Sequence, residues 1–331
     1  MMQPTITEPT TGITDAEPRD PFPGTKPRML LIVNPFATTV SGRLKNLVVY
    51  ALRGRYDIEA VETQRPNHAT ELTRQAVGEG FDLVVSFGGD GTLNEAANGL
   101  AGANLPLSIL PGGSTNVVCR MLGIPTDVVD ATEHLLQLAD DLAPRRIDMG
   151  RVNGRYFIFS SGVGIDADVT RWVDDQPRLK ARGGDATFTY AALRSYFRDY
   201  RGKPPQLEVE VGAHHVSGLS AIVQNSDPYT FFRKTPLRVC EDIAMDDGTI
   251  SLTTMRRASL MLDAPGILYR LFSRKGRLAQ HRQASSFPRI QRATVRSLDG
   301  RGLPLEVDGD YIGHTPEAVY EAAPDSLLVI A

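Results

Sequence analysis

The feature that most constrains the fold is a mostly apolar run that passes through a glycine turn into a helical pattern. Residues 83–87 form the run, Gly88-Gly89-Asp90-Gly91-Thr92 the turn, and residues 93–100 the helix. Such a unit can direct backbone N–H groups and a helix N-terminus at a phosphate. Because Asp90 would repel phosphate unless a cation lay between them, the segment predicts a nucleoside triphosphate with Mg²⁺, and hence phosphoryl transfer.

Similar units on either side of this segment predict the fold of the first half. Strands are predicted at residues 29–33, 57–62, 83–87 and 107–110, and helical spacing follows at 44–52 and 68–77. Asn67 or Thr70 could cap the second of these helices. Strands that alternate with helices predict an α/β fold with a doubly wound, mostly parallel sheet. The glycine turns then fall at the carboxyl ends of strands, where open α/β sheets bind ligands.

The pattern changes near residue 147. An Asn153-Gly154 turn predicts a hairpin, and further strands are predicted at 207–211, 219–223, 249–255, 294–297, 305–307 and 327–330, with one helical insert at 188–200. This half therefore reads as a predominantly antiparallel β-sandwich. We expect a disordered, proline-rich tail at 1–27, a nucleotide-binding α/β domain at 28–145 and a β-rich domain at 146–331.

Composition excludes several classes of protein. A net charge of -3 argues against a polyanion-binding molecule, and two cysteines make neither a disulfide framework nor a zinc site. No apolar run approaches the roughly 20 residues of a membrane span, and the N-terminus lacks the pattern of a secretory signal. The sequence favours a cytoplasmic protein with reduced thiols.

A second glycine turn and an Asn-Pro turn strengthen the phosphate interpretation. Residues 110–116 read Leu-Pro-Gly-Gly-Ser-Thr-Asn, and Asn34-Pro35 follows the first strand. Each turn alone is equally compatible with an ordinary connection between strand and helix. Three such turns at one sheet edge favour a phosphate site. No Gly-Lys-Ser/Thr follows either glycine turn, so this is no Walker P-loop, and the dinucleotide fingerprint is absent.

These motifs, together with Val307-Asp308-Gly309-Asp310, resemble those of the diacylglycerol kinase catalytic-domain family, which includes soluble bacterial lipid kinases and the sphingosine and ceramide kinases. The resemblance covers residues 28–331. The first glycine motif is also similar to that of NAD kinases and phosphofructokinases, which share the N-terminal fold. The resemblance implies an ATP- and Mg²⁺-dependent transferase that phosphorylates a lipid hydroxyl in phospholipid metabolism.

Site residues follow from the resemblance, position by position. Asp310 would be the general base, and Asp90 would lie near the catalytic Mg²⁺ or, in some accounts of the family, would itself act as base. The implied nucleotide contacts are Asn34, Pro35, Phe36, Ala37, Thr38, Thr63, Gly88, Gly89, Asp90, Gly91, Thr92, Leu93, Asn94, Glu95, Gly113, Ser114 and Thr115.

Two positions depart from the family pattern. Val117 stands where the family commonly has Asp, and Asp310 where it has Glu. Asp is one methylene shorter, so the backbone or the substrate would have to lie roughly 1 Å closer for a base to reach its proton. The alternative for Asp308-Gly309-Asp310 is a plain hairpin turn.

Two more carboxylates match family motifs. Asp247, with the carbonyls of Ala244 and Thr249, would hold a structural Mg²⁺, which suits oxygen ligands; an Asp-Gly hairpin turn explains the same residues without metal. Asp166 lies in a segment that would line the interdomain cleft, where it could bind a lipid headgroup or a cation, or stabilise a turn.

Residues 256–301 contain eleven Lys or Arg and two acids, with apolar residues among them. A basic amphipathic segment fits transient docking on anionic lipid, and a solvated basic face is the alternative. No basic motif interleaved with aromatic residues suggests nucleic acid. Two functions remain open beside a diacylglycerol kinase: a sphingoid-base or other long-chain alcohol kinase, and a catalytically silent nucleotide- or lipid-binding regulator. The C-terminal motifs argue against an NAD kinase. A homodimer is compatible with the resemblance.

Overall fold

The computed structural model describes residues 26–176, 204–257, 263–273 and 276–331. In the first half, strands and helices alternate in the order β1 (Arg28–Val33), α1 (Gly42–Leu52), β2 (Asp57–Glu62), α2 (His68–Ala76), β3 (Leu83–Gly88), α3 (Asp90–Leu100), β4 (Leu107–Pro111), α4 (Val117–Leu122) and α5 (Val128–Leu138).

The second half consists mainly of strands. In chain order its elements are β5 (Arg145–Val152), β6 (Arg155–Phe157), β7 (Ser160–Gly164), α6 (Ile165–Asp174), β8 (Leu207–Val211), β9 (His214–Gly218), β10 (Ser220–Gln224), β11 (Thr230–Phe232), β12 (Thr235–Leu237), β13 (Ile250–Met255), α9 (Ala264–Phe272), a 3₁₀ turn (Leu278–Gln280), β14 (Ala284–Ile290), β15 (Arg292–Ser297), β16 (Leu303–Val307), β17 (Asp310–Thr315) and β18 (Glu317–Val329).

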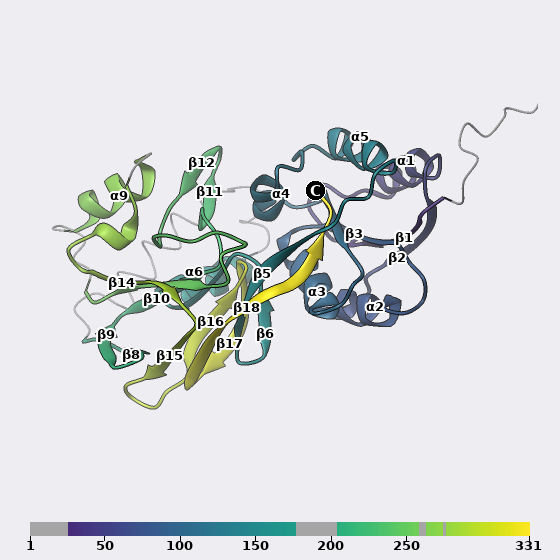
Figure 1. Cartoon of the computed structure of the whole chain (residues 1–331). Helices are drawn as coiled ribbons and strands as arrows, with labels where there is room; N and C mark the ends of the chain where they lie inside the picture. The colour runs from purple at the N-terminus through teal and green to yellow at the C-terminus, as the bar shows by residue number, and fades with distance from the viewer. Residues whose placement is uncertain (1–25, 177–203, 258–262, 274–275) are drawn as a thin grey trace, which may run out of the picture.

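A single large sheet runs through both halves in the order β2-β1-β3-β4-β18-β15-β8-β9, with β5 paired to β18 and β6 paired to β5. The first four strands are parallel. Figure 1 shows α1 and α5 on one face of these strands and α2 and α3 on the other. The predicted doubly wound sheet is confirmed.

Strand β18 joins the halves. It pairs antiparallel with β15 and β5, and its end lies parallel to β4 through Val329 and Leu107. The terminal residues Leu327, Val329 and Ile330 are buried in the same hydrophobic core as β1, β3 and β4. In Figure 1 the C-terminus accordingly lies beside the first strands. The predicted domain boundary near residue 145 stays a prediction, because the sheet is continuous across it.

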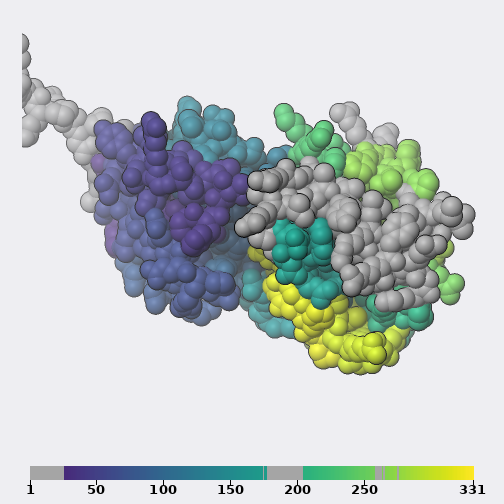
Figure 2. Space-filling model, turned by 180° about the vertical axis from the view of Figure 1, so that it is seen from behind, coloured from purple at the N-terminus to yellow at the C-terminus, as the bar shows by residue number. Residues whose placement is uncertain are grey.

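A six-stranded antiparallel sheet, β14-β13-β10-β7-β16-β17, covers the antiparallel part of the large sheet. A second hydrophobic core lies between the two sheets. It takes Val209, Val295 and Tyr320 from the large sheet and Val223 and Leu305 from the other. The predicted β-sandwich is therefore confirmed. Figure 2 shows the two halves of the chain as adjoining lobes.

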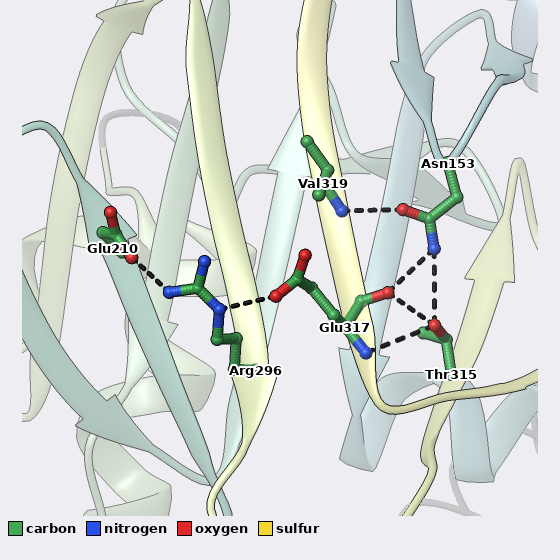
Figure 3. Close-up of polar contacts among 6 residues, drawn as sticks. All are labelled: Asn153, Glu210, Arg296, Thr315, Glu317 and Val319. Carbon is green, nitrogen blue, oxygen red and sulfur yellow. Dashed lines mark hydrogen bonds and ion pairs between the residues drawn. The ribbon is translucent and has the colours of Figure 1, made fainter.

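Polar contacts tie the antiparallel strands together on the exposed side (Figure 3). Arg296 on β15 forms ion pairs with Glu210 on β8 and Glu317 on β18. Asn153, in the predicted Asn-Gly turn, accepts from the Val319 N–H at 2.8 Å and donates to the Glu317 carbonyl at 2.8 Å. The Asn153 contacts fix the β5–β6 hairpin against β18. The Arg296 ion pairs link β15 to β8 and β18.

Two predictions lie mostly or wholly outside the described residues, namely the tail at 1–27, of which only residues 26 and 27 are described, and the helical insert at 188–200. Within the described ranges, no helix is both long and apolar enough to cross a bilayer.

The turn between β16 and β17 carries the motif that the sequence analysis left open. Asp308 and Gly309 occupy its two central positions with positive φ values of 49° and 81°. This is the geometry of a type I′ hairpin, in which glycine and Asp are favoured. The hairpin interpretation of the motif is therefore correct as far as backbone structure goes, and it leaves the role of the side chains to be decided by their contacts.

The Asp308 carboxylate is buried and holds three segments together. Its Oδ1 accepts from the N–H groups of Phe159 and Ser160 at 2.9 and 3.1 Å. Its Oδ2 accepts from the Ile158 N–H and from the Asn94 side chain, both at 2.8 Å. Burial raises the pKa of Asp308 to about 6, although the four hydrogen bonds oppose the shift. One carboxylate thus joins the turn, the segment before β7, and α3 of the first half.

We predict that Asp308→Asn lowers the free energy of unfolding by about 3 kcal/mol. Asn keeps one acceptor oxygen but turns an N–H₂ group toward buried donors, and each buried donor left unsatisfied costs roughly 1–3 kcal/mol. Urea denaturation measures the loss. Asp299→Asn, at an exposed turn between β15 and β16, is the control and should change stability by less than about 0.5 kcal/mol. Equal effects of the two substitutions would contradict the role of Asp308.

Candidate active site

Three loops meet at the carboxyl edge of the parallel strands. The Asn34 N–H donates to the Phe87 carbonyl at 2.9 Å, and the Gly112 N–H donates to the Gly88 carbonyl at 2.7 Å. A Cβ on Gly112 would lie only 2.8 Å from the Gly88 Cα, and one on Gly113 3.0 Å from the Gly89 Cα. The two glycine turns therefore pack backbone against backbone, which requires glycine at these positions.

The Asn-Pro turn is fixed to the first glycine motif by its own side chains. Asn34 donates to the Thr92 hydroxyl at 2.8 Å and accepts from the Phe36 N–H at 3.0 Å. Thr92 is buried, whereas Pro35 and Phe36 are exposed, Phe36 to 84%. Asn34 and Thr92 thus shape the loop from inside, and the segment after Asn34 faces solvent, where a nucleotide could approach.

Asp90 begins α3 and its carboxylate faces the start of α4. The two oxygens accept from the N–H groups of Val117 and Val118 at 3.1 and 3.3 Å. Burial raises the pKa of Asp90, and these amides oppose the shift. The Val117 side chain is itself buried, and the residue contacts Asp90 through its backbone N–H. The lone pairs that the amides leave unused fit a Mg²⁺ that takes most of its ligands from phosphate and water.

Asp310 lies directly on the first turn of α3. A Cβ built on Gly91 would overlap the Asp310 Oδ2 and lie 3.1 Å from its Cγ. Asp310 therefore reaches the glycine motif only because Gly91 has no side chain. The structure brings together two predicted site residues, Asp90 and Asp310, whose positions differ by 220 in the sequence.

The end of the first glycine motif has a structural role that the sequence analysis did not predict. Leu93 is buried in the core, and Asn94 donates to Asp308 at 2.8 Å. Glu95 accepts from the N–H groups of Asn67 and Ala69 at 2.8 and 3.2 Å, so it caps α2. Asn67 itself makes no side-chain cap, contrary to prediction. These three motif residues hold the protein together and do not line the loops.

The other predicted nucleotide contacts lie around the same edge. Thr63 is buried beside the end of β1, where its N–H donates to the Val33 carbonyl at 2.8 Å. Ser114 is exposed and Thr115 partly exposed, so both hydroxyls are open to a ligand. Ala37 is partly exposed and Thr38 exposed in the loop after Asn34. Nucleotide binding by these residues stays a prediction.

The loop around Asp247 matches the turn alternative. Its carboxylate accepts from the Ala244 N–H at 3.0 Å and from the N–H and hydroxyl of Thr249 at 2.9 and 2.7 Å. These bonds occupy most of the carboxylate's lone pairs, and both predicted partners approach it with donors. These contacts account for the loop without a metal. A structural Mg²⁺ at Asp247 stays a prediction.

Arg120 is a site residue that the sequence analysis missed. Its Nε donates to the Thr115 carbonyl at 3.0 Å, and an Nη donates to the Arg233 carbonyl at 3.1 Å. Its guanidinium also lies 5.0 Å from the Phe231 ring centre, within range of a cation–π contact. Arg120 thus joins the second glycine turn to the β11–β12 hairpin of the other half. Arg233 and Phe231 come from a distant segment, so no local signal marked this link between the halves.

Ion pairs hold part of the basic segment 256–301. Among its described residues six arginines pair with acids elsewhere in the chain or within the segment, namely Arg277 with Asp227, Arg282 with Asp263, Arg289 with Asp242, Arg292 with Glu321, Arg296 with Glu210 and Glu317, and Arg301 with Asp299. These pairs compensate part of the positive charge counted along the segment, and Arg256 and Arg257 are exposed. The segment also exposes apolar side chains, because Leu268, Tyr269 and Phe272 on α9 are 55%, 73% and 42% exposed.

Known proteins match this architecture over most of the chain. Residues 28–152 match the diacylglycerol kinase catalytic domain, and residues 160–331 match the YegS C-terminal NAD kinase beta sandwich-like domain. A diacylglycerol kinase of Bacillus subtilis is 29% identical over 268 residues, 79% of this chain and 82% of that protein. One from Staphylococcus haemolyticus is 28% identical over 82% of this chain and 78% of its own length.

A solved structure agrees with the fold. The crystal structure of a diacylglycerol kinase from Bacillus anthracis superimposes with a TM-score of 0.65 at 18% identity, over 92% of this chain and 96% of that one. At this level of sequence identity, the structural similarity shows the fold alone. The family match covers both halves and includes both glycine turns and the Asp308-Gly309-Asp310 hairpin. The chain therefore belongs to the diacylglycerol kinase catalytic-domain family and is a lipid kinase.

Proposed function

We propose that this kinase transfers the γ-phosphoryl group of ATP to a hydroxyl of diacylglycerol, giving phosphatidic acid and ADP. The observation that carries the proposal is the position of Asp310, whose carboxylate lies against Gly91 in the glycine motif. A base and a phosphate-binding turn in contact are what phosphoryl transfer to an alcohol requires.

The chain's own groups divide the chemistry as follows. Backbone N–H groups of the glycine turns, with the exposed Ser114 and Thr115 hydroxyls, bind the phosphates and stabilise charge on the transferring group. Asp310 accepts the proton of the lipid hydroxyl. The hydroxyl oxygen bonds to the γ-phosphorus as the bond between that phosphorus and the bridging oxygen of the β-phosphate breaks. Mg²⁺, held by Asp90, would offset phosphate charge.

Two carboxylates compete for the role of base, and their contacts favour Asp310. Both oxygens of Asp90 accept hydrogen bonds from the start of α4. These bonds stabilise the ionised carboxylate and direct it toward backbone donors, which disfavours Asp90 as the proton acceptor. Asp310 is partly exposed and lies on the β16–β17 hairpin. The shorter side chain of Asp reaches the motif because Gly91 lacks a Cβ.

Incubation with radiolabelled ATP and a total lipid extract tests the function directly. We expect label in phosphatidic acid. Label in a phosphorylated sphingoid base or another long-chain alcohol would favour that alternative acceptor, and label in NADP, with NAD added, would favour an NAD kinase. ATP binding without transfer to any lipid would favour a silent regulator, an alternative that Val117 and Asp310 suggest by departing from the family pattern.

A double-mutant cycle tests the contact between Asp310 and Gly91. We predict that Asp310→Asn lowers kcat by roughly 10²–10⁴-fold, the usual contribution of a general base, with little change in ATP affinity. Gly91→Ala should lower kcat similarly by displacing Asp310, although Ala favours helices over Gly by roughly 0.5–1 kcal/mol.

The double variant separates this explanation from others. If the Gly91→Ala substitution acts through Asp310, the double variant should be no less active than the worse single variant. Losses that multiply in the double variant, or near-normal turnover of Asp310→Asn, would contradict the proposed base. Thermal unfolding of each variant identifies any loss of activity that follows from instability.

We further propose that α9 contacts the bilayer that holds the substrate. Leu268 and Phe272 lie one turn apart with Tyr269 beside Leu268, and all three are exposed. Phe272 packs edge-on against Phe232 at 5.5 Å between ring centres, so the helix rests on the β11–β12 hairpin that Arg120 connects to the glycine loops. Apolar side chains on α9 would thus meet the lipid. Cytoplasmic localisation with transient membrane contact, and a homodimer, stay predictions.

Leu268→Glu should weaken docking. Burying a leucine in an apolar phase contributes roughly 1.5–3 kcal/mol, so we expect about ten-fold weaker binding to diacylglycerol-containing vesicles in a sedimentation assay. Activity on a short-chain diacylglycerol in free solution should not change. Leu47→Glu, at a leucine on α1 with similar exposure (57%), is the control. If both variants bind vesicles alike, α9 is not the contact.

A further inference from the structure

A buried and a partly buried carboxyl group lie behind the turn that carries Asp310. Glu306 on β16 is only 1% exposed, and Asp166 lies in the first turn of α6. A Cβ on Gly162 of β7 would overlap the Asp166 Oδ2 and lie 2.9 Å from the Glu306 Oε1. Both oxygens therefore border the space that Gly162 leaves open, and a side chain at residue 162 would separate them.

The hydrogen-bond donors around the pair leave one oxygen without a partner. The Tyr229 hydroxyl donates to the Asp166 Oδ2 at 2.6 Å, and the Gly309 N–H donates to the Glu306 Oε2 at 2.8 Å. Among the described residues, the buried Glu306 Oε1 has no N–H or O–H partner. A buried carboxylate oxygen without a donor is costly, but a protonated oxygen facing a carboxylate has its acceptor in place.

We propose that Glu306 is neutral and donates its proton to Asp166 across the space at Gly162, and that this bridge positions the Asp308–Asp310 turn for the reaction. The inference rests on the proposed role of Asp310 as base. Glu306 is a positioning residue here, because its other oxygen holds the Gly309 N–H, between the anchor Asp308 and the base Asp310. The proton stays on the pair throughout the reaction.

The electrostatics agree with this assignment. Burial raises the pKa of Glu306 well above its usual range, and the neighbouring Asp166 raises it further. Burial also raises the pKa of Asp166, but hydrogen bonds from Tyr229 and Glu306 oppose that shift. The other titratable groups that act on Glu306, Asp166 or Tyr229 are Asp308, Tyr320, and, next to Tyr229, Cys240. All of these are acids, so an ionised Glu306 would face further negative charge.

Glu306→Gln tests the proton without disturbing the geometry. Its side-chain N–H₂ can donate to Asp166 and its oxygen can accept from Gly309, as proposed for neutral Glu306. The folded state of the wild type holds a proton that the unfolded chain releases above the ordinary glutamate pKa. Wild-type stability should therefore fall as the pH rises from about 4.5 toward the raised pKa, by up to ten-fold in the unfolding equilibrium constant per pH unit.

We expect urea denaturation between pH 5 and 9 to show Glu306→Gln gaining stability over the wild type as the pH rises. Glu59→Gln, at an exposed glutamate on β2, should show no such gain. A stability difference between Glu306→Gln and wild type that is constant with pH, or a variant less stable than wild type throughout, would overturn the shared proton. The denaturation experiment needs no enzymatic activity, so it tests the shared proton even if the proposed function is wrong.

Kinetics test the positioning. Glu306→Gln should keep kcat within about two-fold of the wild type at pH 7 and hold it at alkaline pH, where the wild type declines as Glu306 ionises. Glu306→Met, which has neither donor nor acceptor, should lower kcat at least ten-fold, with ATP affinity little changed and the protein still folded. If folded Glu306→Met keeps wild-type kcat, or if Glu306→Gln loses activity as Glu306→Met does, the positioning role is wrong.

Discussion

The arrangement of the site depends on one buried carboxylate, that of Asp308. It accepts four hydrogen bonds from the segment before β7 and from α3, and it belongs to a turn with positive backbone φ angles. Asp310 follows two residues later. The direction of that turn, and with it the reach of Asp310 to Gly91, is set by a contact between the two halves of the chain. Burial opposes ionisation of Asp308, so holding the ionised carboxylate in this position has an electrostatic cost.

The fold could be predicted from sequence where the signal is local. Short apolar runs and glycine turns identified β1, β3 and β4, and the Asn153-Gly154 dipeptide identified the β5–β6 hairpin. The path of β18 could not be predicted. It contains Pro324 and a register shift between Ala323 and Leu327, with Asp325 at positive φ, so only its last residues have the pattern of a strand. Its pairing with β4 depends on partners more than 200 residues away.

The site shows the same division. The sequence predicted that the glycine turns share one edge, because parallel strands end together. It did not separate residues that face a ligand from those that hold the loops. A carboxylate beside a glycine turn can bind a cation or accept backbone N–H groups, and the sequence pattern is the same. Glu95 caps α2, and Asp90 contacts α4. Charge counted along 256–301 overstates the unpaired positive charge for a related reason, since acids such as Glu210 and Glu321 compensate part of it from other strands.

The departures from the family pattern form a consistent set when the packing is considered. An Asp at residue 310 is shorter than Glu, yet its carboxylate lies against Gly91, where any larger residue would displace it. The close approach needs a turn that cannot move outward, and both Asp308 and Glu306 hold that turn from behind. At residue 117 the buried Val side chain brings no carboxylate, and the backbone N–H contacts Asp90. The shorter side chain at residue 310 is compatible with the proposed role of Asp310 as base, because the turn packs close enough against Gly91 to supply the reach.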